Sequence, residues 1–420
     1  MKKTVAVIGV GRVGLPLALV LADSGHRVIG IDTVQLKLDM LNKGSMPFVE
    51  KGAHLLLKKH LNRNLSFSIS YQPIRESDIV ILTLGTPVDE NMNPVLDQIN
   101  QALDSIIPFL KPNTLIILRS TVSPRTTIYV KNTIETKTKF RTGKDIFLAY
   151  CPERIAEGNA INEIKEIPQI IGGIDKISSK KARDFFHSLG IKYLLSDAVS
   201  AELAKLFTNM YRYISFAIAN EFMVIAESFN RNIHEIIKLV NDGYKRGGLV
   251  LPGLTAGPCL FKDGFFLVNE NPFLDLIVAS WKINEALPLF ILKKIRERIN
   301  LKNKKIAILG LSFKPEIDDI RESLSFKIRK ALIREYSQVI LHDPFVKNYN
   351  NQKIEINLKQ ALKGVDVIIV ATRHKYYEKK KREILKSINK NTYVCDIWNM
   401  FGTNKMIFKA GQIETKQING

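Results

Sequence analysis

The chain has 420 residues, of which 45% are hydrophobic and 25% are charged, which is typical of a globular protein and too long for one domain. Its three cysteines are far apart and form no CxxC pair, so we expect neither a disulfide framework nor a metal site, and a reducing cytoplasm. The net charge of +21 suggests nucleic-acid binding, but lysine is spread along the whole chain and no recognition motif accompanies it. We therefore expect a protein of two or three domains that binds no nucleic acid.

The N-terminus predicts a strand, a glycine-rich turn and a helix. Arg12 interrupts the apolar stretch that would otherwise resemble a signal peptide, and no later run approaches a membrane span. A strand over 4–8 leads into Gly9-Val-Gly-Arg-Val-Gly14, and a second strand over 28–31 leads into Asp32. The glycines allow a pyrophosphate to approach a helix N-terminus, and the acid can bind both ribose hydroxyls. Because Asp32 would repel a 2′-phosphate, we predict that NAD is the cofactor rather than NADP.

An internal repeat indicates a second unit of the same kind. Residues 3–9 are matched by 304–310, and two later Val- and Ile-rich runs in the first part have counterparts at 366–371 and 391–396. Such runs, apolar with little alternation, are typical of parallel strands buried on both faces between helices. The predicted fold class is α/β, with two Rossmann-like doubly wound domains.

The middle of the chain predicts one long helix followed by an irregular loop. From 200 to about 230 apolar residues recur at helical spacing without Pro or Gly, and the helix should join the two domains. It is too apolar for simple exposure, so we expect it to bury a face against a partner subunit. The Gly- and Pro-rich stretch 243–264 cannot continue as helix, and long irregular loops are often functional.

Six further motifs, in order and spacing, resemble the UDP-glucose/GDP-mannose dehydrogenase family over nearly the whole chain. They are Gly85-Thr-Pro-Val-Asp89, Arg119-Ser-Thr-Val122, Cys151-Pro-Glu-Arg-Ile-Ala-Glu-Gly158, Ala201-Glu-Leu-Ala-Lys-Leu-Phe-Thr-Asn209, Gly257-Pro-Cys-Leu-Phe-Lys-Asp263 and Phe313-Lys-Pro-Glu-Ile-Asp-Asp-Ile-Arg-Glu-Ser323. The resemblance implies an NAD-binding domain over 1–197, a central helical region over 198–298 that forms a homodimer and carries the catalytic cysteine loop, and a domain over 299–420 that binds the nucleotide sugar.

The resemblance assigns the nucleophile to Cys259 and a catalytic aspartate to Asp263. A thiolate needs nearby positive charge and access for the substrate, and Lys262 is close in sequence. Lys205 and Asn209 are four residues apart on the predicted helix, so their side chains share one face and can stabilise a single substrate oxyanion. An inert buried cysteine and a solvated lysine are the alternatives that the family motifs disfavour.

Hydrolysis of a thioester needs a carboxylate base, and the resemblance offers two. Glu153 is our first choice, while Glu157 would orient a residue or a water, or serve only as a helix cap or salt-bridge partner. Thr121 resembles the family threonine that positions water. The remaining expected contacts are with the cofactor (Gly9, Gly11, Val13, Gly14, Asp32, Thr86, Thr121) and with the substrate (Glu153, Arg154, Lys205, Asn209, Lys314, Arg321).

The implied reaction is an oxidation of a sugar CH2OH by two hydride transfers, through a thiohemiacetal and a thioester on Cys259. The Pro-Glu-Arg-Ile segment resembles the N-acetylhexosamine branch, whereas Cys-Leu-Phe-Lys-Asp resembles the UDP-glucose branch. We favour UDP-N-acetyl-mannosamine or UDP-N-acetyl-glucosamine, with UDP-glucose and GDP-mannose as alternatives, for surface polysaccharide precursors. A non-catalytic NAD-binding protein and a two-electron hydroxyacid dehydrogenase are rivals, but neither requires the cysteine motif.

Overall fold

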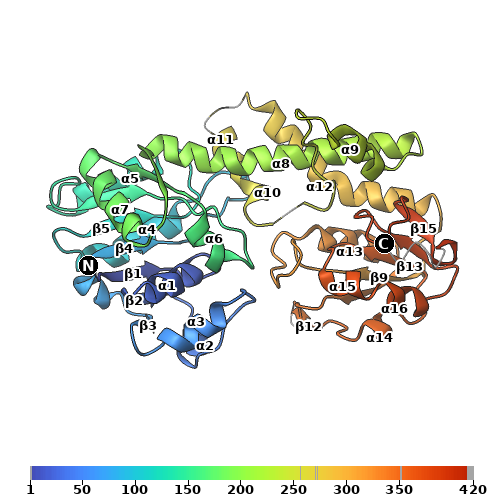
Figure 1. Cartoon of the computed structure of the whole chain (residues 1–420), viewed down its shortest axis with the longest axis horizontal. Helices are drawn as coiled ribbons and strands as arrows, with labels where there is room; N and C mark the ends of the chain where they lie inside the picture. The colour runs from blue at the N-terminus through green and yellow to red at the C-terminus, as the bar shows by residue number, and fades with distance from the viewer. Residues whose placement is uncertain (1, 256, 270, 272, 351, 414–420) are drawn as a thin grey trace. The chain divides into compact units, whose positions relative to one another are not determined.

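The computed structural model describes residues 2–255, 257–269, 271, 273–350 and 352–413 (Figure 1). The chain separates into two compact units, and each is described by itself. The first unit comprises Met1–Thr208 and Lys262–Pro272, and the second comprises Asn209–Phe261 and Phe273–Gly420.

The first unit is built on an eight-stranded sheet with the order β3-β2-β1-β4-β5-β6-β7-β8. Neighbouring strands are parallel except for the β6–β7 pair, which is antiparallel. The strands are β1 (Thr4–Ile8), β2 (Arg27–Ile31), β3 (Leu65–Ser68), β4 (Ile79–Leu82), β5 (Leu115–Leu118), β6 (Phe147–Tyr150), β7 (Gln169–Gly173) and β8 (Tyr193–Asp197). The helices are α1 (Gly14–Asp23), α2 (Gln35–Asn42), α3 (Ala53–His60), α4 (Asp97–Ile106), α5 (Thr126–Lys137), α6 (Ala160–Glu166), α7 (Lys176–Ser188) and α11 (Phe265–Val268), with short 3₁₀ turns η1 (Gln72–Glu76) and η2 (Ile107–Phe109).

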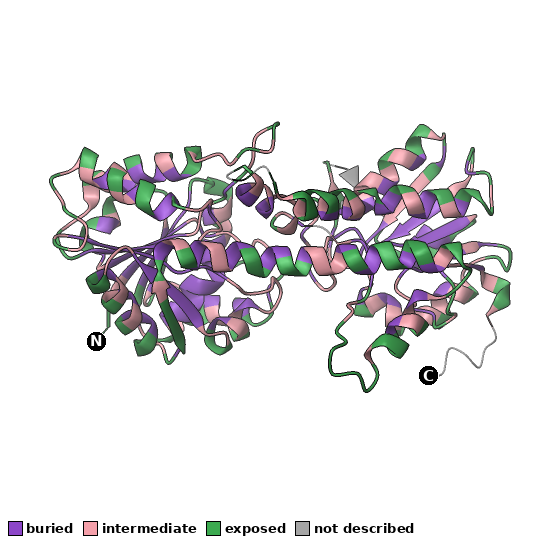
Figure 2. Ribbon diagram, turned by 90° about the horizontal axis from the view of Figure 1, so that it is seen from above, coloured by how far each residue is buried: buried purple, intermediate pink, exposed green. Residues whose placement is uncertain are grey.

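Alternate residues of the central strands enter two different apolar layers. In β1, Val5 and Val7 belong to one buried cluster, whereas Ala6 and Ile8 belong to another on the opposite face. Burial on both faces explains why these strands read as continuous apolar runs in the sequence. Figure 2 shows the strands of this sheet largely in the colour of buried residues.

The second unit repeats the plan on a smaller scale, with a five-stranded sheet in the order β10-β9-β13-β14-β15. The β14–β15 pair is antiparallel and the other pairs are parallel. The strands are β9 (Lys305–Leu309), β10 (Gln338–His342), β13 (Val367–Val370), β14 (Tyr393–Cys395) and β15 (Ile407–Lys409), beside a hairpin of β11 (Asn348–Tyr349) and β12 (Gln352–Lys353). The helices are α9 (Ile233–Asn241), α12 (Asp275–Arg296), α13 (Leu324–Arg334), α14 (Leu358–Leu362), α15 (Lys375–Lys379) and α16 (Lys381–Lys386), with a 3₁₀ turn η3 (Ala410–Gln412).

The predicted repeat and fold class are therefore confirmed. The matched runs at 304–310, 366–371 and 391–396 contain β9, β13 and β14, which are adjacent in the second sheet. Their side chains alternate between two buried clusters as in the first unit, since Ile306 and Ile308 lie in one and Ala307 and Leu309 in the other.

The predicted long helix is α8 (Ala198–Ser228), which has 31 residues. The boundary between the two units falls within it, after Thr208. After α9 the described residues form no helix or strand until the short helix α10 (Leu260–Asp263), as the Gly and Pro content predicts. Within the described part of the chain, no helix is both long and apolar enough to span a lipid bilayer.

Candidate active site

The turn between β1 and α1 has the shape of a phosphate cradle. Gly9 has a φ of +90°, and a Cβ there would lie 2.6 Å from the Thr83 carbonyl oxygen. A Cβ on Gly14 would lie 1.9 Å from the Gly9 oxygen, so both positions exclude a side chain. A Cβ on Gly11 would meet nothing within 4 Å. The backbone is therefore closely packed at Gly9 and Gly14. At Gly11 the surrounding space is open, so the backbone there can approach a pyrophosphate.

Asp32 lies at the carboxyl end of β2 and is nearly buried. Its Oδ2 accepts a hydrogen bond from the Val10 N–H (3.0 Å) and its Oδ1 accepts one from the Val34 N–H (3.0 Å). The Lys37 ammonium lies 2.6 Å from Oδ2, a contact that the sequence analysis missed. These contacts fix the carboxylate beside the glycine turn, the position at which an acid recognises an adenosine ribose. The residues present therefore fit NAD.

The ion pair leads to a prediction about cofactor selectivity. Asp32→Asn should remove the charge that repels a 2′-phosphate and release Lys37 to bind it, while keeping the shape of the side chain. We expect the ratio of kcat/KM for NAD over that for NADP to fall roughly 100-fold, as a change of a few kcal/mol implies. Steady-state kinetics with both cofactors measure this ratio.

Lys37 supplies the control for this experiment. The double variant Asp32→Asn/Lys37→Ala should lose the gain with NADP, because no cation then replaces the carboxylate. Equal NADP activity in the single and double variants would show that Lys37 plays no part in selectivity.

The other expected cofactor residues lie at loops that follow neighbouring strands. Val13 immediately precedes α1, Thr86 is buried after β4, and Thr121 is half-buried after β5. The Ser120 hydroxyl donates a hydrogen bond to the Leu84 carbonyl oxygen (2.7 Å), which ties the two loops together. These loops share the carboxyl edge of the sheet with Gly9 and Asp32, where ligands bind in open α/β folds.

Glu153 is held by a buried ion pair with Arg119. Its Oε1 also accepts hydrogen bonds from the backbone N–H groups of Arg154 (2.8 Å) and Ile155 (3.0 Å). Arg119 further donates to the Cys151 carbonyl oxygen (3.2 Å) and to Gln169 Oε1 (2.8 Å). Both carboxylate oxygens of Glu153 thus already accept hydrogen bonds. A water could therefore donate a proton to Glu153 only at an oxygen that one of these donors also occupies. The sequence analysis quoted Arg119 within a motif but assigned it no role.

The rest of this loop is anchored by other carboxylates. Glu50 accepts hydrogen bonds from the N–H groups of Gly158 (2.9 Å) and Ala160 (2.8 Å). Glu157 forms a longer ion pair with Arg12 (3.7 Å), a residue of the glycine turn, so it links this loop to the cofactor cradle. Arg154 donates to the Pro168 carbonyl oxygen, and burial lowers the pKa of its guanidinium.

Helix α8 places Lys205 and Asn209 one turn apart, and both are buried, with exposed fractions of 9% and 5%. Within the described residues no carboxylate forms an ion pair with Lys205, although a buried ammonium normally requires one. Glu202, one turn earlier, accepts hydrogen bonds from Thr127 and from the Arg125 N–H, and burial raises the pKa of its carboxyl. Among the described residues, Lys205 therefore has no ion-pair partner that would compete with a ligand.

The cysteine loop leads into α10. Cys259 is exposed, whereas Asp263 is fully buried and pairs with Lys262, whose ammonium lies 2.9 Å from Oδ1. Lys262 also donates to the Thr86 hydroxyl (3.4 Å), which brings α10 to the cofactor loop after β4. The other two cysteines are buried, and burial raises the pKa of Cys151 to about 12 and that of Cys395 far above its usual range. Cys259 is therefore the cysteine that a substrate can reach.

Within the second unit, the cysteine loop contacts the motif that begins at Phe313. Gly257 has a φ of +112°, and a Cβ there would lie 2.7 Å from Phe313 Cδ2. Since Gly257 is two residues before Cys259 and Phe313 is one residue before Lys314, the contact brings together two segments that the sequence analysis assigned to one substrate. Any larger residue at 257 would separate them.

A buried network holds the backbone around Lys314. Ser312 donates to the Lys314 carbonyl oxygen (2.8 Å), and His374 Nδ1 accepts from the Glu316 N–H (3.0 Å). The His374 proton therefore lies on Nε2, 3.2 Å from Asp343 Oδ2. Burial disfavours ionisation of Asp343, but hydrogen bonds from His374 and from backbone N–H groups outweigh it and lower the pKa of the carboxyl. Sequence reasoning missed this network.

Asp343 occupies the place in the second unit that Asp32 occupies in the first. It follows β10 and accepts the Leu311 N–H (2.6 Å), as Asp32 follows β2 and accepts the Val10 N–H. However, His374 covers Asp343, so this acid is closed to a ribose. Arg321, the other expected substrate residue here, forms a two-pronged pair with Asp319 (3.0 and 2.6 Å).

In the described part of the chain, no group of three or more His, Cys, Asp or Glu side chains could hold a metal ion.

Known proteins match most of the chain. Three models of the UDP-glucose/GDP-mannose dehydrogenase family match: the NAD binding domain at residues 3–190, the central domain at 199–285 and the UDP binding domain at 307–403. A UDP-N-acetyl-D-mannosamine dehydrogenase of Methanocaldococcus jannaschii is 32% identical over 95% of this chain and 92% of its own. One of Campylobacter jejuni is 34% identical over 89% and 96%. The structure of a UDP-D-ManNAc dehydrogenase from Pyrococcus horikoshii superposes with a TM-score of 0.86, at 29% identity over 92% and 93%.

Proposed function

The chain belongs to the UDP-glucose/GDP-mannose dehydrogenase family of NAD-dependent nucleotide-sugar dehydrogenases, and on this premise we propose that it oxidises C6 of a UDP-N-acetylhexosamine from CH2OH to carboxylate. One alcohol, two NAD⁺ and one water give one carboxylate, two NADH and three protons. The observation that carries this proposal is the exposed thiol of Cys259, on a loop that packs against Phe313 beside Lys314.

In the proposed mechanism, the glycine turn and Asp32 would hold NAD, which would supply the hydride acceptor for each of two oxidations. Between them, the Cys259 sulfur adds to the aldehyde carbon to form a thiohemiacetal, whose oxidation leaves a thioester. The Lys205 ammonium and the Asn209 amide stabilise the negative charge on the reacting oxygen, as preorganised donors in a buried site do. Asp263 is proposed to hold Lys262 in place through the pair described above.

Hydrolysis releases the carboxylate and restores the thiol. Glu153 is the proposed base that takes a proton from the attacking water, which Thr121 positions. Its ion pair with Arg119 and its two backbone hydrogen bonds fix the carboxylate for this task but also restrain it. Glu157 has the supporting role of joining this loop to Arg12, and Arg154, Lys314 and Arg321 are proposed to bind the substrate.

The relatives named above support UDP-N-acetyl-mannosamine as the substrate. UDP-N-acetyl-glucosamine, UDP-glucose and GDP-mannose remain the alternatives. A uronate made in this way would serve as a precursor of surface polysaccharide, and the proposed location of the enzyme is the cytoplasm. We retain the division into 1–197, 198–298 and 299–420 as the proposed domain plan.

An assay of these four nucleotide sugars with NAD tests the proposal. We expect the highest kcat/KM with UDP-N-acetyl-mannosamine and two NADH for each uronate, measured by absorbance and by mass spectrometry of the product. A ratio of one NADH per product would exclude the four-electron reaction, and a preference for UDP-glucose or GDP-mannose would correct the substrate alone.

The apolar surface of α8 supports a homodimer. Large side chains at 207, 211, 218, 222 and 225, and Phe229 just beyond the helix, are each at least 41% exposed and recur at intervals of three, four or seven residues. Such spacing forms one continuous stripe, and a stripe of this size normally meets a partner. The stripe is therefore proposed to bury itself against the same stripe of a second copy.

Charge on this stripe should separate the subunits. Phe222→Glu/Ile225→Glu is expected to give a monomer at micromolar concentration in light scattering, where the unaltered chain is a dimer, because two carboxylates per subunit would be desolvated. Leu36→Glu on α2, which is even more exposed, is the matched control and should remain a dimer. A monomeric unaltered chain would contradict the proposal.

A further inference from the structure

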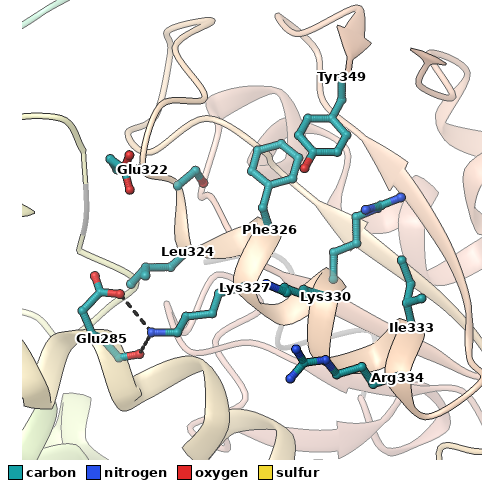
Figure 3. Close-up of a pocket in the computed structure, with 11 residues that line it drawn as sticks. Glu285, Glu322, Leu324, Phe326, Lys327, Lys330, Ile333, Arg334 and Tyr349 are labelled. Atoms are coloured by element: carbon teal, nitrogen blue, oxygen red, sulfur yellow. Dashed lines mark hydrogen bonds and ion pairs between the residues drawn. The ribbon is translucent and has the colours of Figure 1, made fainter. Parts of the chain in front are cut away.

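The second unit has a cavity of about 560 Å³ along α13, whose lining includes Glu322 and Ser323, the last two residues of the motif that starts at Phe313 (Figure 3). Successive turns of α13 form most of its wall, with Glu285 from α12 and Tyr349 from β11. Neither Lys314 nor Arg321 is among the described residues that line it. Its volume lies in the range of ordinary ligand sites.

The cavity carries a surplus of positive charge. Four cations line it (Lys327, Arg329, Lys330, Arg334) against two carboxylates (Glu285, Glu322). Lys327 donates to Glu285 through both the carboxylate (2.9 Å) and the backbone carbonyl oxygen (2.7 Å), so these two charges offset one another. Glu322 is then the one other carboxylate among the described residues that line the cavity, against three cations (Arg329, Lys330, Arg334). No carboxylate among the described residues forms an ion pair with any of these three cations.

The spacing of the cations makes this arrangement unfavourable without an anion. Lys330 and Arg334 are four residues apart, so they lie on one face of the helix and repel. Together with Arg329 they span roughly 7.5 Å of helix axis, at about 1.5 Å per residue. A chain of linked phosphates would meet more of them at once than a single phosphate could.

The described aromatic side chains of the cavity leave no ring free to stack with a nucleobase. The rings of Phe326 and Tyr349 lie beside each other in Figure 3. They stack with a centroid distance of 4.1 Å and an angle of 16°. The Arg329 guanidinium lies over the Tyr349 ring at 5.3 Å, which holds this cation in place. Because Tyr349 is already engaged by both neighbours, a nucleobase would have to displace one of them to stack there.

We infer that this cavity is a second anion site, which binds a diphosphate group through Arg329, Lys330 and Arg334. The site recognises the diphosphate group itself, whether free or as part of a nucleotide. Its three cations form no ion pair with a described carboxylate, whereas the Tyr349 ring already contacts Phe326 and Arg329. The site is independent of the proposed oxidation chemistry.

Equilibrium dialysis of the full chain with radiolabelled inorganic pyrophosphate tests this inference. Lys330→Glu/Arg334→Glu alters two exposed side chains and should lose one equivalent of bound pyrophosphate, or weaken it by at least about ten-fold, because two attractions become repulsions. Lys302→Glu/Lys359→Glu makes the same change of net charge at exposed positions that do not line the cavity, and should bind as the unaltered chain does. Equal stoichiometry and affinity in all three proteins would overturn the inference.

Competition identifies the source of the diphosphate. UDP and unlabelled pyrophosphate should displace the label from the Lys330- and Arg334-dependent site with similar affinity, whereas uridine should not displace it. Displacement by UDP at concentrations ten-fold lower or less would show that the base is recognised, and would overturn the phosphate-only assignment. Binding of a single-stranded oligonucleotide that depends on the same two residues, without binding of pyrophosphate, would assign the surface to nucleic acid instead.

Discussion

Replacement of Cys259 by alanine is expected to lower the steady-state rate of uronate formation by about three orders of magnitude or more, as loss of a covalent nucleophile commonly does. In the proposed mechanism, this thiol forms the bond that carries the aldehyde into the second oxidation. Cys151 and Cys395 cannot replace it, because both are buried and burial raises the pKa of each thiol. Traces of the aldehyde that the first oxidation forms are expected as the remaining product.

Binding measurements show whether the loss is chemical. NAD and the nucleotide sugar should bind to Cys259→Ala about as tightly as to the unaltered chain in calorimetry, since the exposed thiol supports no core packing. Cys395→Ala is the cysteine control, and while folded it should keep most of the turnover, because that thiol lies in the core of the second unit. Near-normal turnover of Cys259→Ala would rule out the covalent route.

Replacement of Glu153 by glutamine is expected to trap the thioester. The first turnover should release two NADH per active site in a burst, and later turnovers should slow by roughly 100-fold or more, a typical effect of removing a general base. Intact-protein mass spectrometry should show a sugar-acyl adduct, and peptide mapping should place it on Cys259.

The Arg119 pair adds a second, separable effect. Glutamine can still accept the backbone N–H groups of Arg154 and Ile155, but it leaves the Arg119 guanidinium buried without a counter-ion. The free energy of unfolding should therefore fall by about 3–5 kcal/mol at most, the cost of breaking a buried ion pair, and the melting temperature should fall with it. Glu163→Gln is the control and should show no adduct; this residue lies on α6, and its carboxylate accepts a hydrogen bond from the Ala156 N–H (2.6 Å). A stability loss without an adduct would give Glu153 a purely structural role and leave Glu157 as the candidate base.

The sequence by itself determined the cofactor cradle, the fold class and the family. Gly9 and Gly14 are dictated by close backbone contacts that no side chain permits, and strands buried on both faces must be apolar throughout, so both leave local signals in the sequence. The 31-residue helix α8 was likewise predictable from its apolar periodicity. The order of the six motifs then indicated the nucleotide-sugar dehydrogenases before any contact was known.

Only the tertiary structure decided which of these residues contact one another and which of their charges are paired. Arg119 and Glu153 are 34 positions apart, Ser312 and His374 are 62 apart, and nothing in the intervening sequence fixes such pairs. The same is true of Lys37 on Asp32 and of Gly257 against Phe313, because a side-chain contact depends on the rotamer and on the packing of separate elements. The basic cavity along α13 is a further case, since the sequence shows its lysines and arginines but not that Glu285 from another helix offsets only one of them.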